Sequence, residues 1–478
     1  MLHLRCQAVL AVFAIACSQQ GLAEQSLGGC TPDEQQILSA ADAAAQDNFS
    51  SDVAISGQTA VLSAPFKETA GQLYAGAAYV FAKTNGKGTE QWSQQINLVA
   101  PDAAAEDVFG ASVAIDGSTI VIGAPGRDVP HTDSGAAYVF TLVEQDGAQS
   151  WIHQATLTAS DPGVNDEFGN DVAIEGDRIV IGAWLANNAV YVFERSNDGW
   201  IEQAKIESPA EPFTTSVFGR SVALWGDTIA VGDIGAEVDD ISYAGAVYIF
   251  VRQGEQWVQQ TKLDNPHPEF GDSVGDDIAL EGDTLLVGAS SDNPGGMANA
   301  GTTFVYQRTA GVWKLAAELN SSDAATGDGF GGALALSGNW ALIGARSDDH
   351  SGQINIGSVY VFIHASDEWV EHSKFSGSDS SDGDQFGNAL ALEGNAAIIG
   401  SFGAEFANQE DSGAAYAFRI GCAPGDITED GAVNVDDLLT VINLWGNCPD
   451  PPAKCPADLN DDGTVNVDDL LIVINNWS

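Results

Sequence analysis

Two acidic stretches near the C-terminus have the residue types and spacing to bind a metal ion. They read DITEDGAVNVDD, starting at Asp426, and DLNDDGTVNVDD, starting at Asp458. A twelve-residue calcium-binding loop takes oxygen ligands from positions 1, 3, 5, 7, 9 and 12, with glycine at position 6 for the sharp turn. Both stretches meet this pattern, with Gly431 and Gly463 at the turn. The sequence therefore predicts two calcium sites.

The predicted ligands occupy equivalent positions in the two loops. In the first loop they are Asp426, Thr428, Asp430, Ala432 through its carbonyl oxygen, Asn434 and Asp437. In the second loop they are Asp458, Asn460, Asp462, Thr464 through its carbonyl oxygen, Asn466 and Asp469. Thr428 offers a neutral hydroxyl where the second loop has an amide oxygen. We therefore expect the first site to bind calcium less tightly.

An apolar segment with helical spacing follows each loop. The apolar residues are Leu438, Leu439, Val441, Ile442 and Trp445 in the first copy, and Leu470, Leu471, Val473, Ile474 and Trp477 in the second. This spacing predicts two helices, and we expect their stripes to pack on each other. No helical pattern precedes either loop, where CAPG and KCPA stand. The arrangement therefore differs from the helix–loop–helix EF-hand.

Residues 422–478 resemble a type I dockerin domain. The resemblance implies a small α-helical domain that binds calcium and docks onto a cohesin-like protein domain, which tethers the chain to a scaffold or a cell surface. Recognition in that family often uses Ser-Thr at loop positions 10 and 11, where this chain has Val435-Asp436 and Val467-Asp468. The near identity of the two copies is compatible with two binding orientations related by a half-turn. The alternative is a module that binds calcium and only caps the chain.

The residues before this domain repeat one pattern. Stretches such as VFGASVAIDGSTIVIGAP and EFGNDVAIEGDRIVIGAW recur, and each leads to an aromatic segment such as AAYVF. One phenylalanine marks each copy: Phe49, Phe109, Phe168, Phe218, Phe270, Phe330 and Phe386. Apolar runs bounded by glycine turns predict four strands in each copy. Seven such copies predict an all-β, seven-bladed propeller over residues 24–421.

The first segment of the mature chain is expected to complete the last blade. The seventh copy stops after its third strand, at AAYAF, whereas CTPDEQQILSAADAAAQDNFS, starting at Cys30, aligns with the fourth strands of other copies. This alignment places Cys30 beside Cys422 at one hairpin end and predicts a disulfide there. Cys448 and Cys455 are expected to close the link CPDPPAKC. The four cysteines that follow residue 23 allow three pairings in an exported chain, and this is the pairing we predict.

The repeats resemble the FG-GAP repeats of bacterial exported proteins and of the integrin α-subunit head. The resemblance covers about residues 30–421 and implies the propeller fold. Several integrin blades carry D-x-D-x-D-G calcium loops, and no repeat of this chain contains one. We therefore expect neither calcium sites in the blades nor integrin-type ligand recognition.

The loops before each repeat phenylalanine and those after the second strand are expected to open on one face. Such a loop face is the natural ligand surface of a propeller, and we expect a glycan or a protein as its ligand. An aspartate stands two residues before the phenylalanine in five repeats: Asp47, Asp107, Asp166, Asp328 and Asp384. Aspartate at such a position caps turns, so we interpret these residues as structural.

The net charge of the chain limits its possible partners, and the N-terminal residues indicate its cellular location. The 67 acidic and 17 basic residues give a formal net charge of −50. Such a surface excludes nucleic acid and anionic membranes as partners. An apolar run followed by Gly21-Leu22-Ala23 predicts a secretory signal over residues 1–23, with cleavage before Cys17 and lipid attachment as the alternative. We expect no membrane span in the chain that remains after cleavage. We expect this chain to be secreted, and attachment at the cell surface is the alternative.

Sequence motifs for catalysis are missing. The chain contains no H-E-x-x-H, no G-x-S-x-G and no glycine-rich phosphate loop before a helix. Carboxylates are so abundant that no pair for glycoside hydrolysis can be singled out. We therefore favour a secreted, non-catalytic binding or adhesion propeller. The alternatives are an enzyme or accessory component of extracellular polysaccharide degradation, and a purely structural surface protein.

Overall fold

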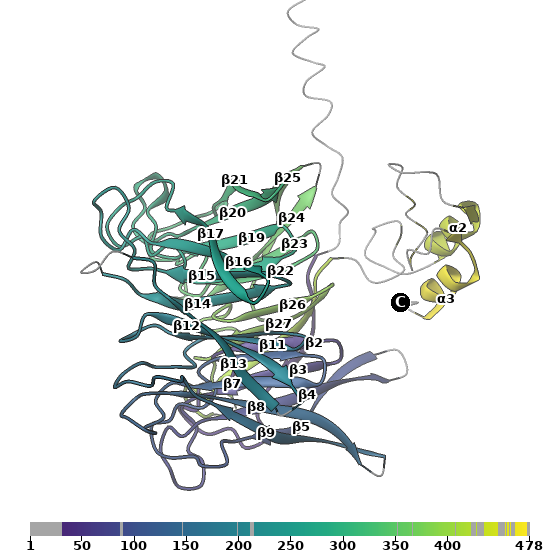
Figure 1. Ribbon diagram of the computed structural model, residues 1–478. Coiled ribbons are helices and arrows are strands. Elements are labelled where there is room, and N and C mark those ends of the chain that lie inside the picture. Colours follow the sequence, from purple (N-terminus) through teal and green to yellow (C-terminus); the bar gives the residue numbers. More distant parts are fainter. Residues whose placement is uncertain are drawn as a thin grey trace, which may run out of the picture. The chain divides into compact units, whose positions relative to one another are not determined.

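The computed structural model places the chain in two compact units, Pro32–Ile420 and a second one that includes Gly421–Ser478 (Figure 1). It describes residues 31–421, except 87–88, 146, 198, 211–214, 351, 366 and 407. After residue 421 it describes residues 427, 435–447, 455, 457, 459 and 464–475. The expected signal, residues 1–23, lies outside this part. Within it, no helix has the length and apolar character to cross a bilayer.

Within Pro32–Ile420, the strands form seven four-stranded antiparallel sheets, the blades of a propeller. Blade 1 consists of β2 (Val53–Ser56), β3 (Thr59–Ala64), β4 (Ala77–Gly86) and β5 (Thr89–Leu98). Blade 2 consists of β6 (Val113–Asp116), β7 (Thr119–Ala124), β8 (Ala136–Gln145) and β9 (Ala148–Leu157). Blade 3 consists of β10 (Val172–Glu175), β11 (Arg178–Ala183), β12 (Ala189–Ser196) and β13 (Gly199–Glu207). In each of these three sheets, the strands lie side by side in the order in which they occur in the sequence.

The next three blades repeat this order. Blade 4 consists of β14 (Phe218–Trp225), β15 (Thr228–Asp233), β16 (Ala246–Gln253) and β17 (Gln256–Asp264). Blade 5 consists of β18 (Ile278–Glu281), β19 (Thr284–Ala289), β20 (Thr302–Thr309) and β21 (Val312–Leu319), with the short 3₁₀ helix η1 (Pro294–Gly296) in a loop. Blade 6 consists of β22 (Ala333–Ser337), β23 (Trp340–Ala345), β24 (Ser358–Ala365) and β25 (Glu368–Phe375).

The N-terminal strand completes blade 7, as its alignment with fourth strands predicted. Strand β1 (Asp33–Leu38) pairs antiparallel with β28 (Ala414–Arg419), which follows β26 (Leu390–Glu393) and β27 (Ala396–Ser401). Glu34 of β1 accepts hydrogen bonds from Ser378, as Glu202 of β13 does from Ser160. The equivalent contacts show that β1 occupies the position of an outer strand, which closes the ring.

The hydrophobic core lies between neighbouring blades. Strand β7, with the sequence TIVIGA, is buried at every position. Its Ile120 and Ile122 pack in one cluster with Val61 and Val80 of the preceding blade. Because each middle strand is covered on both faces, its residues form a continuous apolar run instead of alternating with polar ones. Outer strands such as β9 cover little and are mostly exposed.

The repeat phenylalanines confirm this packing in six blades and correct the seventh assignment. Phe109 and its equivalents are fully buried, and its ring meets Tyr138 edge to face at 5.4 Å. Phe270 is instead 76% exposed, and Val274 takes the core position of blade 5 by pairing with Gly245 as Phe109 pairs with Gly76. The assignment of Phe270 as the marker of the fifth repeat was therefore wrong.

The aspartates two residues before the core position cap turns, as expected. Asp107 accepts the backbone N–H of Ala104 at 2.7 Å, and the other four predicted aspartates accept equivalent N–H groups. Asp272, two residues before Val274, does the same for Glu269 at 2.7 Å. This contact agrees with the corrected frame of blade 5.

A chain of hydrogen bonds joins the hairpins between the first and second strands around the ring. We call the boundary between two neighbouring blades a seam. At six of the seven seams, the residue before the turn glycine of one blade accepts the N–H of the turn glycine of the next blade. The acceptors are Ser56, Asp116, Glu175, Glu281, Ser337 and Glu393. In blade 4 the equivalent residue is Trp225, whose side chain has no acceptor. The seam between blades 4 and 5 therefore lacks this contact.

The second unit contains two short helices, α2 (Val435–Asn443) and α3 (Val467–Asn475), which contact each other. Strands β29 (Gly446–Asn447) and β30 (Thr464–Val465) pair antiparallel. Val441, Ala457, Val465 and Val473 are fully buried in a small core between these elements. This unit is the only helical part among the described residues apart from η1.

Candidate functional site

The last predicted ligand of each calcium loop lies in the core of the second unit. Asp437, near the start of α2, and Asp469, near the start of α3, are both fully buried. Asp437 Oδ1 accepts the backbone N–H of Ile427 at 2.7 Å, and Asp469 Oδ1 accepts that of Leu459 at 2.6 Å. Ile427 and Leu459 occupy position 2 of their loops. The same contact therefore joins the beginning and the end of both loops.

Two further predicted ligands of the second loop can be placed. Asn466 donates its backbone N–H to Asp469 Oδ2 at 2.8 Å and its side-chain N–H to the carbonyl oxygen of Thr464 at 3.0 Å. The other eight predicted ligands, namely Asp426, Thr428, Asp430, Ala432, Asn434, Asp458, Asn460 and Asp462, lie outside the described residues. Among the described ones, no three carboxylate, His or Cys side chains group to hold a metal.

The charge around the buried aspartates fits a cation. A fully buried carboxylate requires a compensating positive charge or strong hydrogen bonds. Lys454 is the sole basic residue of residues 422–478, which contain ten Asp and one Glu. Oxygen ligands with this charge suit calcium. Asp437 and Asp469 would each hold one ion, together with the remaining ligands of its own loop.

Only one of the four cysteines of the two predicted disulfides belongs to the part of the chain that the structure describes. Cys30, Cys422 and Cys448 lie outside the described residues, and Cys455 is partly buried beside the small core. Both proposed disulfides, Cys30–Cys422 and Cys448–Cys455, therefore remain predictions.

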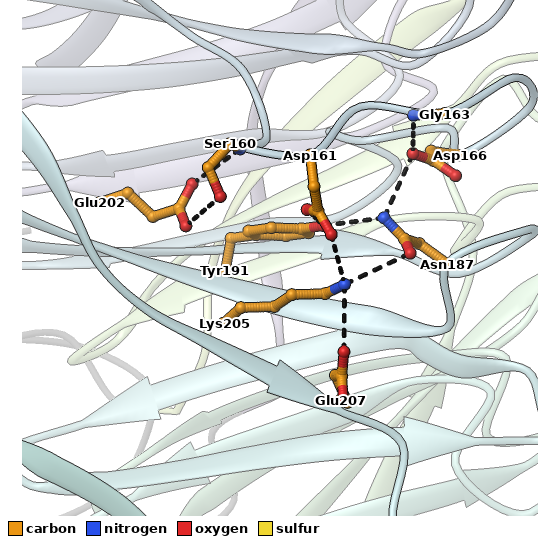
Figure 2. Close-up of polar contacts among 9 residues, drawn as sticks. All are labelled: Ser160, Asp161, Gly163, Asp166, Asn187, Tyr191, Glu202, Lys205 and Glu207. Carbon is orange, nitrogen blue, oxygen red and sulfur yellow. Dashed lines mark hydrogen bonds and ion pairs between the residues drawn. The ribbon is translucent and has the colours of Figure 1, made fainter.

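The loop face of the propeller carries a polar cluster that sequence reasoning missed. In blade 3, Asp161 accepts the hydroxyl hydrogen of Tyr191 at 2.7 Å and pairs with Lys205 Nζ at 2.8 Å (Figure 2). The Lys205 ammonium is the main cause that lowers the pKa of Asp161, and burial raises the pKa of Tyr191. Asn187 also donates to the Tyr191 hydroxyl at 2.9 Å.

Recurrence shows that this cluster is architectural. The same tyrosine–aspartate contact occurs in four other blades, as Tyr79–Asp42, Tyr138–Asp102, Tyr360–Asp323 and Tyr416–Asp379, at 2.7–2.8 Å. The contact fastens the loop before each of these five blades to the third strand of the blade. The signal was available in the sequence as an aspartate seven residues ahead of the repeat phenylalanine in these five blades.

Asp52, Asp171 and Asp277 are among the residues that line a central cavity of about 470 Å³ at the loop end of the inner strands. Each carboxylate accepts the N–H of its own next residue and one from the next blade: Asp52 from Val53 and Val113, Asp171 from Val172 and Val222, and Asp277 from Ile278 and Leu334. Withdrawal from bulk water raises the pKa of Asp52 to about 7, of Asp171 to about 6 and of Asp277 to about 8. These residues join blades around the axis.

Two protein-family models match the sequence of this chain. The FG-GAP repeat model matches residues 32–81, 92–140, 151–193, 200–250, 257–306, 313–362 and 369–418. The chain belongs to the FG-GAP repeat family. The dockerin type I domain model matches residues 424–477. Both resemblances drawn from the sequence are thereby confirmed, as is the fold of a seven-bladed propeller with a small helical domain.

Solved structures add only distant likenesses. A 6-phosphogluconolactonase, described as putative, from Bacteroides fragilis is 11% identical, covering 71% of this chain and 86% of its own, with a TM-score of 0.47. Another from Bacteroides uniformis is 10% identical, covering 67% and 84%, with a TM-score of 0.46. A search of the curated proteins found no match.

The dockerin helices bury only part of their apolar stripes against each other. Leu438, Val441, Leu470 and Val473 face the small core. Leu439, Ile442 and Trp445 of the first copy, and Leu471 and Ile474 of the second, are exposed instead. The two stripes therefore pack on each other through Leu438, Val441, Leu470 and Val473, so the expected contact is confirmed for this part of each stripe. Apolar residues at i and i+1 lie about 100° apart on a helix, so one contact cannot cover both.

Proposed function

We propose that this FG-GAP protein is exported and tethered through its dockerin domain to a cohesin-like protein domain, and that the propeller is a non-catalytic binding module. The observation that carries the tether is a matched pair of exposed apolar faces. Val435, Leu439 and Ile442 lie on one face of α2, and Val467, Leu471 and Ile474 lie at the equivalent places of α3.

These faces have the character of a docking surface. All six side chains are between 45% and 53% exposed, although they are aliphatic. Clustered exposed apolar residues mark protein interaction sites, and their burial drives association. Because the two faces carry nearly the same residues, either helix can present the same surface to a partner. This supports two docking orientations related by a half-turn.

Calcium is proposed to control the tether. Two ions, one in each loop, would offset the buried charges of Asp437 and Asp469 and hold α2 and α3 in position. Metal binding to such loops is coupled to folding. We propose that the first site is the weaker one, because Thr428 supplies a hydroxyl where Asn460 supplies an amide oxygen. Export by residues 1–23 and two disulfides complete the proposal.

The tether is tested with the full-length protein and a panel of purified type I cohesin domains. Binding is measured by surface plasmon resonance in millimolar calcium and again in excess EDTA. We expect binding in calcium that EDTA abolishes. Ile442→Asp and Ile474→Asp should each leave binding through the other helix, whereas the double variant should lose it. Val312→Asp, at an exposed aliphatic residue of the propeller, is the matched control.

Two outcomes would contradict the proposal. Binding that is unchanged in EDTA would remove the role of calcium, and binding that survives the double variant would remove the role of the helix faces. Polysaccharide hydrolysis by the same protein, lost when loop carboxylates are replaced, would support the enzyme alternative for the propeller.

A further inference from the structure

Two exposed tyrosines on the loop face occupy positions that favour asparagine or aspartate. At six seams between blades, a loop residue accepts the N–H of the residue before the next blade's core position. Its backbone has a positive φ each time. Four of these residues are Asp133, Asn299, Asn355 and Asp411, which tolerate this left-handed conformation. The other two are Tyr74 and Tyr243, both with a φ of 56°.

Neither packing nor backbone conformation accounts for these two tyrosines. Tyr74 is 44% exposed and Tyr243 is 39% exposed. A bulky residue in the left-handed region is a conformational outlier, and such outliers point to function when nothing else requires them. Each tyrosine meets a second exposed aromatic ring edge to face: Phe66 at 5.8 Å from Tyr74, and Phe270 at 6.1 Å from Tyr243. The propeller therefore displays two aromatic pairs to solvent.

The first pair lies in a shallow pocket of about 350 Å³ with acidic and amide groups. The pocket is built from two adjoining seams, which contribute Gln46, Asn48 and Asp411 on one side and Glu106 and Tyr74 on the other. The side chains of Gln46, Asn48, Glu106 and Asp411 make no hydrogen bond or ion pair with any residue that the structure describes. Two carboxylates beside two aromatic rings are thus open to a ligand.

The charge of the surroundings indicates the ligand. The chain carries a net charge of −50, and the neighbouring Lys67 is buried and already paired with Asp42 and Asp47 at 3.4 and 3.0 Å. Aromatic faces attract ammonium and guanidinium groups, and carboxylates strengthen that attraction. A neutral sugar would gain from the rings but nothing from the charge, and an anionic ligand would be repelled.

We propose that the Phe66–Tyr74 pocket binds a lysine or arginine side chain of a basic polypeptide. The Tyr243–Phe270 pair offers a second aromatic subsite on the same face. The loop that carries it reads GAEVDDISYAG and is acidic as well. A partner with several basic side chains could engage both subsites. This inference rests on the proposal that the loop face of the propeller binds a ligand, and it names the class of that ligand.

Binding of a fluorescein-labelled, acetylated tetralysine amide to the full-length protein tests the inference. Anisotropy is measured in physiological salt. Tyr74→Asn installs the residue type of the other seams, so it should keep the fold, and we expect binding to weaken about threefold. The double variant Glu106→Gln, Asp411→Asn should weaken it about tenfold. Glu255→Gln, an exposed carboxylate in the hairpin between β16 and β17, controls for bulk charge and should change it less than twofold.

Several results would overturn the inference. These are no binding, an equal loss in Glu255→Gln, or binding of neutral cellohexaose that the charge variants leave unchanged. Thermal unfolding of each variant shows whether it folds. Cohesin binding is measured on the same samples, because a protein that still binds cohesin but not tetralysine contradicts this inference alone. Loss of cohesin binding with retained tetralysine binding contradicts only the tether.

Discussion

At the scale of single residues, the core of six of the seven blades contains a buried phenylalanine. Phe330 is fully buried and meets Tyr360 at 5.3 Å, whereas Phe270 lies outside the core and Val274 replaces it. A smaller valine in blade 5 is accompanied by Phe304 where the other blades carry tyrosine. Blade 5 therefore reaches its packing with a different pair of side chains.

Two alanine substitutions test this correction. Phe270→Ala should change the free energy of unfolding by less than about 0.5 kcal/mol, because the side chain is 76% exposed. Phe330→Ala should lower it by about 3–5 kcal/mol, because it leaves a cavity between blades. Urea unfolding of both variants, followed by tryptophan fluorescence, makes the comparison. A large loss in Phe270→Ala would show that the original repeat frame was right.

At the scale of elements, hairpins and edges hold the ring together. Six hairpin turns donate an N–H to the preceding blade, and Trp225 interrupts the series. Its side chain is exposed and gives no acceptor to Gly282. The seam between blades 4 and 5 is thus the place where an added contact has most to contribute.

Trp225→Glu is expected to complete the series. Glutamate at this position would accept the N–H of Gly282, as Glu281 accepts that of Gly338 at 2.6 Å. The free energy of unfolding should rise by about 0.5–1.5 kcal/mol. Glu281→Ala, the reverse change one blade later, should lower it by a similar amount. Chemical denaturation of the two variants checks both signs, and a destabilised Trp225→Glu protein would contradict the reasoning.

The edge where the chain closes on itself predicts a disulfide. Asp33 pairs with Arg419 at the end of the β1–β28 ladder. Cys30 stands three residues before Asp33, and Cys422 stands three residues after Arg419. A bond there would fasten β1 to blade 7. In the simple chain-entropy model it contributes about 4–6 kcal/mol, because the closed loop contains almost the whole propeller.

Mass mapping of non-reduced peptides should identify the Cys30–Cys422 bond directly. Dithiothreitol should lower the melting temperature of the wild-type propeller, and Cys30→Ser should lower it to the same value without further response to reductant. Reduction of the second predicted disulfide, Cys448–Cys455, acts on the dockerin domain, and Cys448→Ser separates the two effects. Peptides that join Cys30 to Cys448 or Cys455 would refute the pairing.

At the scale of the whole molecule, carboxyl groups line the propeller axis as well as its surface. The carboxyl groups of Asp52, Asp171 and Asp277 have pKa values raised to about 7, 6 and 8, whereas their usual value is 3.8. Burial is the main cause of all three increases, and the nearby Asp171 carboxylate raises the pKa of Asp52 and of Asp277 further. The folded protein therefore binds more protons than the unfolded chain between about pH 4 and 8.

Stability should consequently fall as the pH rises through this window. Protons bound only in the folded state stabilise it, and their contribution is complete below pH 4 and lost above pH 8. Repulsion among the many surface carboxylates acts in the same direction. Melting temperatures between pH 5 and 8 measure the slope, which Asp171→Asn should reduce while Asp116→Asn should not. An equal slope in wild type and Asp171→Asn would exclude the central aspartates as its source.

The sequence by itself determined the repeats, the closing strand and the dockerin domain. Local chemistry decides these features, because glycine turns, apolar runs and the spacing of loop oxygens act over a few residues. Even the error at Phe270 was local. Phe109 and Gly117 stand eight residues apart, as do Val274 and Gly282, whereas Phe270 lies twelve from Gly282.

Only the tertiary structure decided which of these residues face solvent and which meet across blades. The pocket of Phe66 and Tyr74 joins loops from two seams, and the aspartates at the axis come from blades 1, 3 and 5. Likewise, the outward faces of α2 and α3 follow from which side of each helix the small core covers. Such relations depend on contacts between residues far apart in the chain, and no local pattern specifies them.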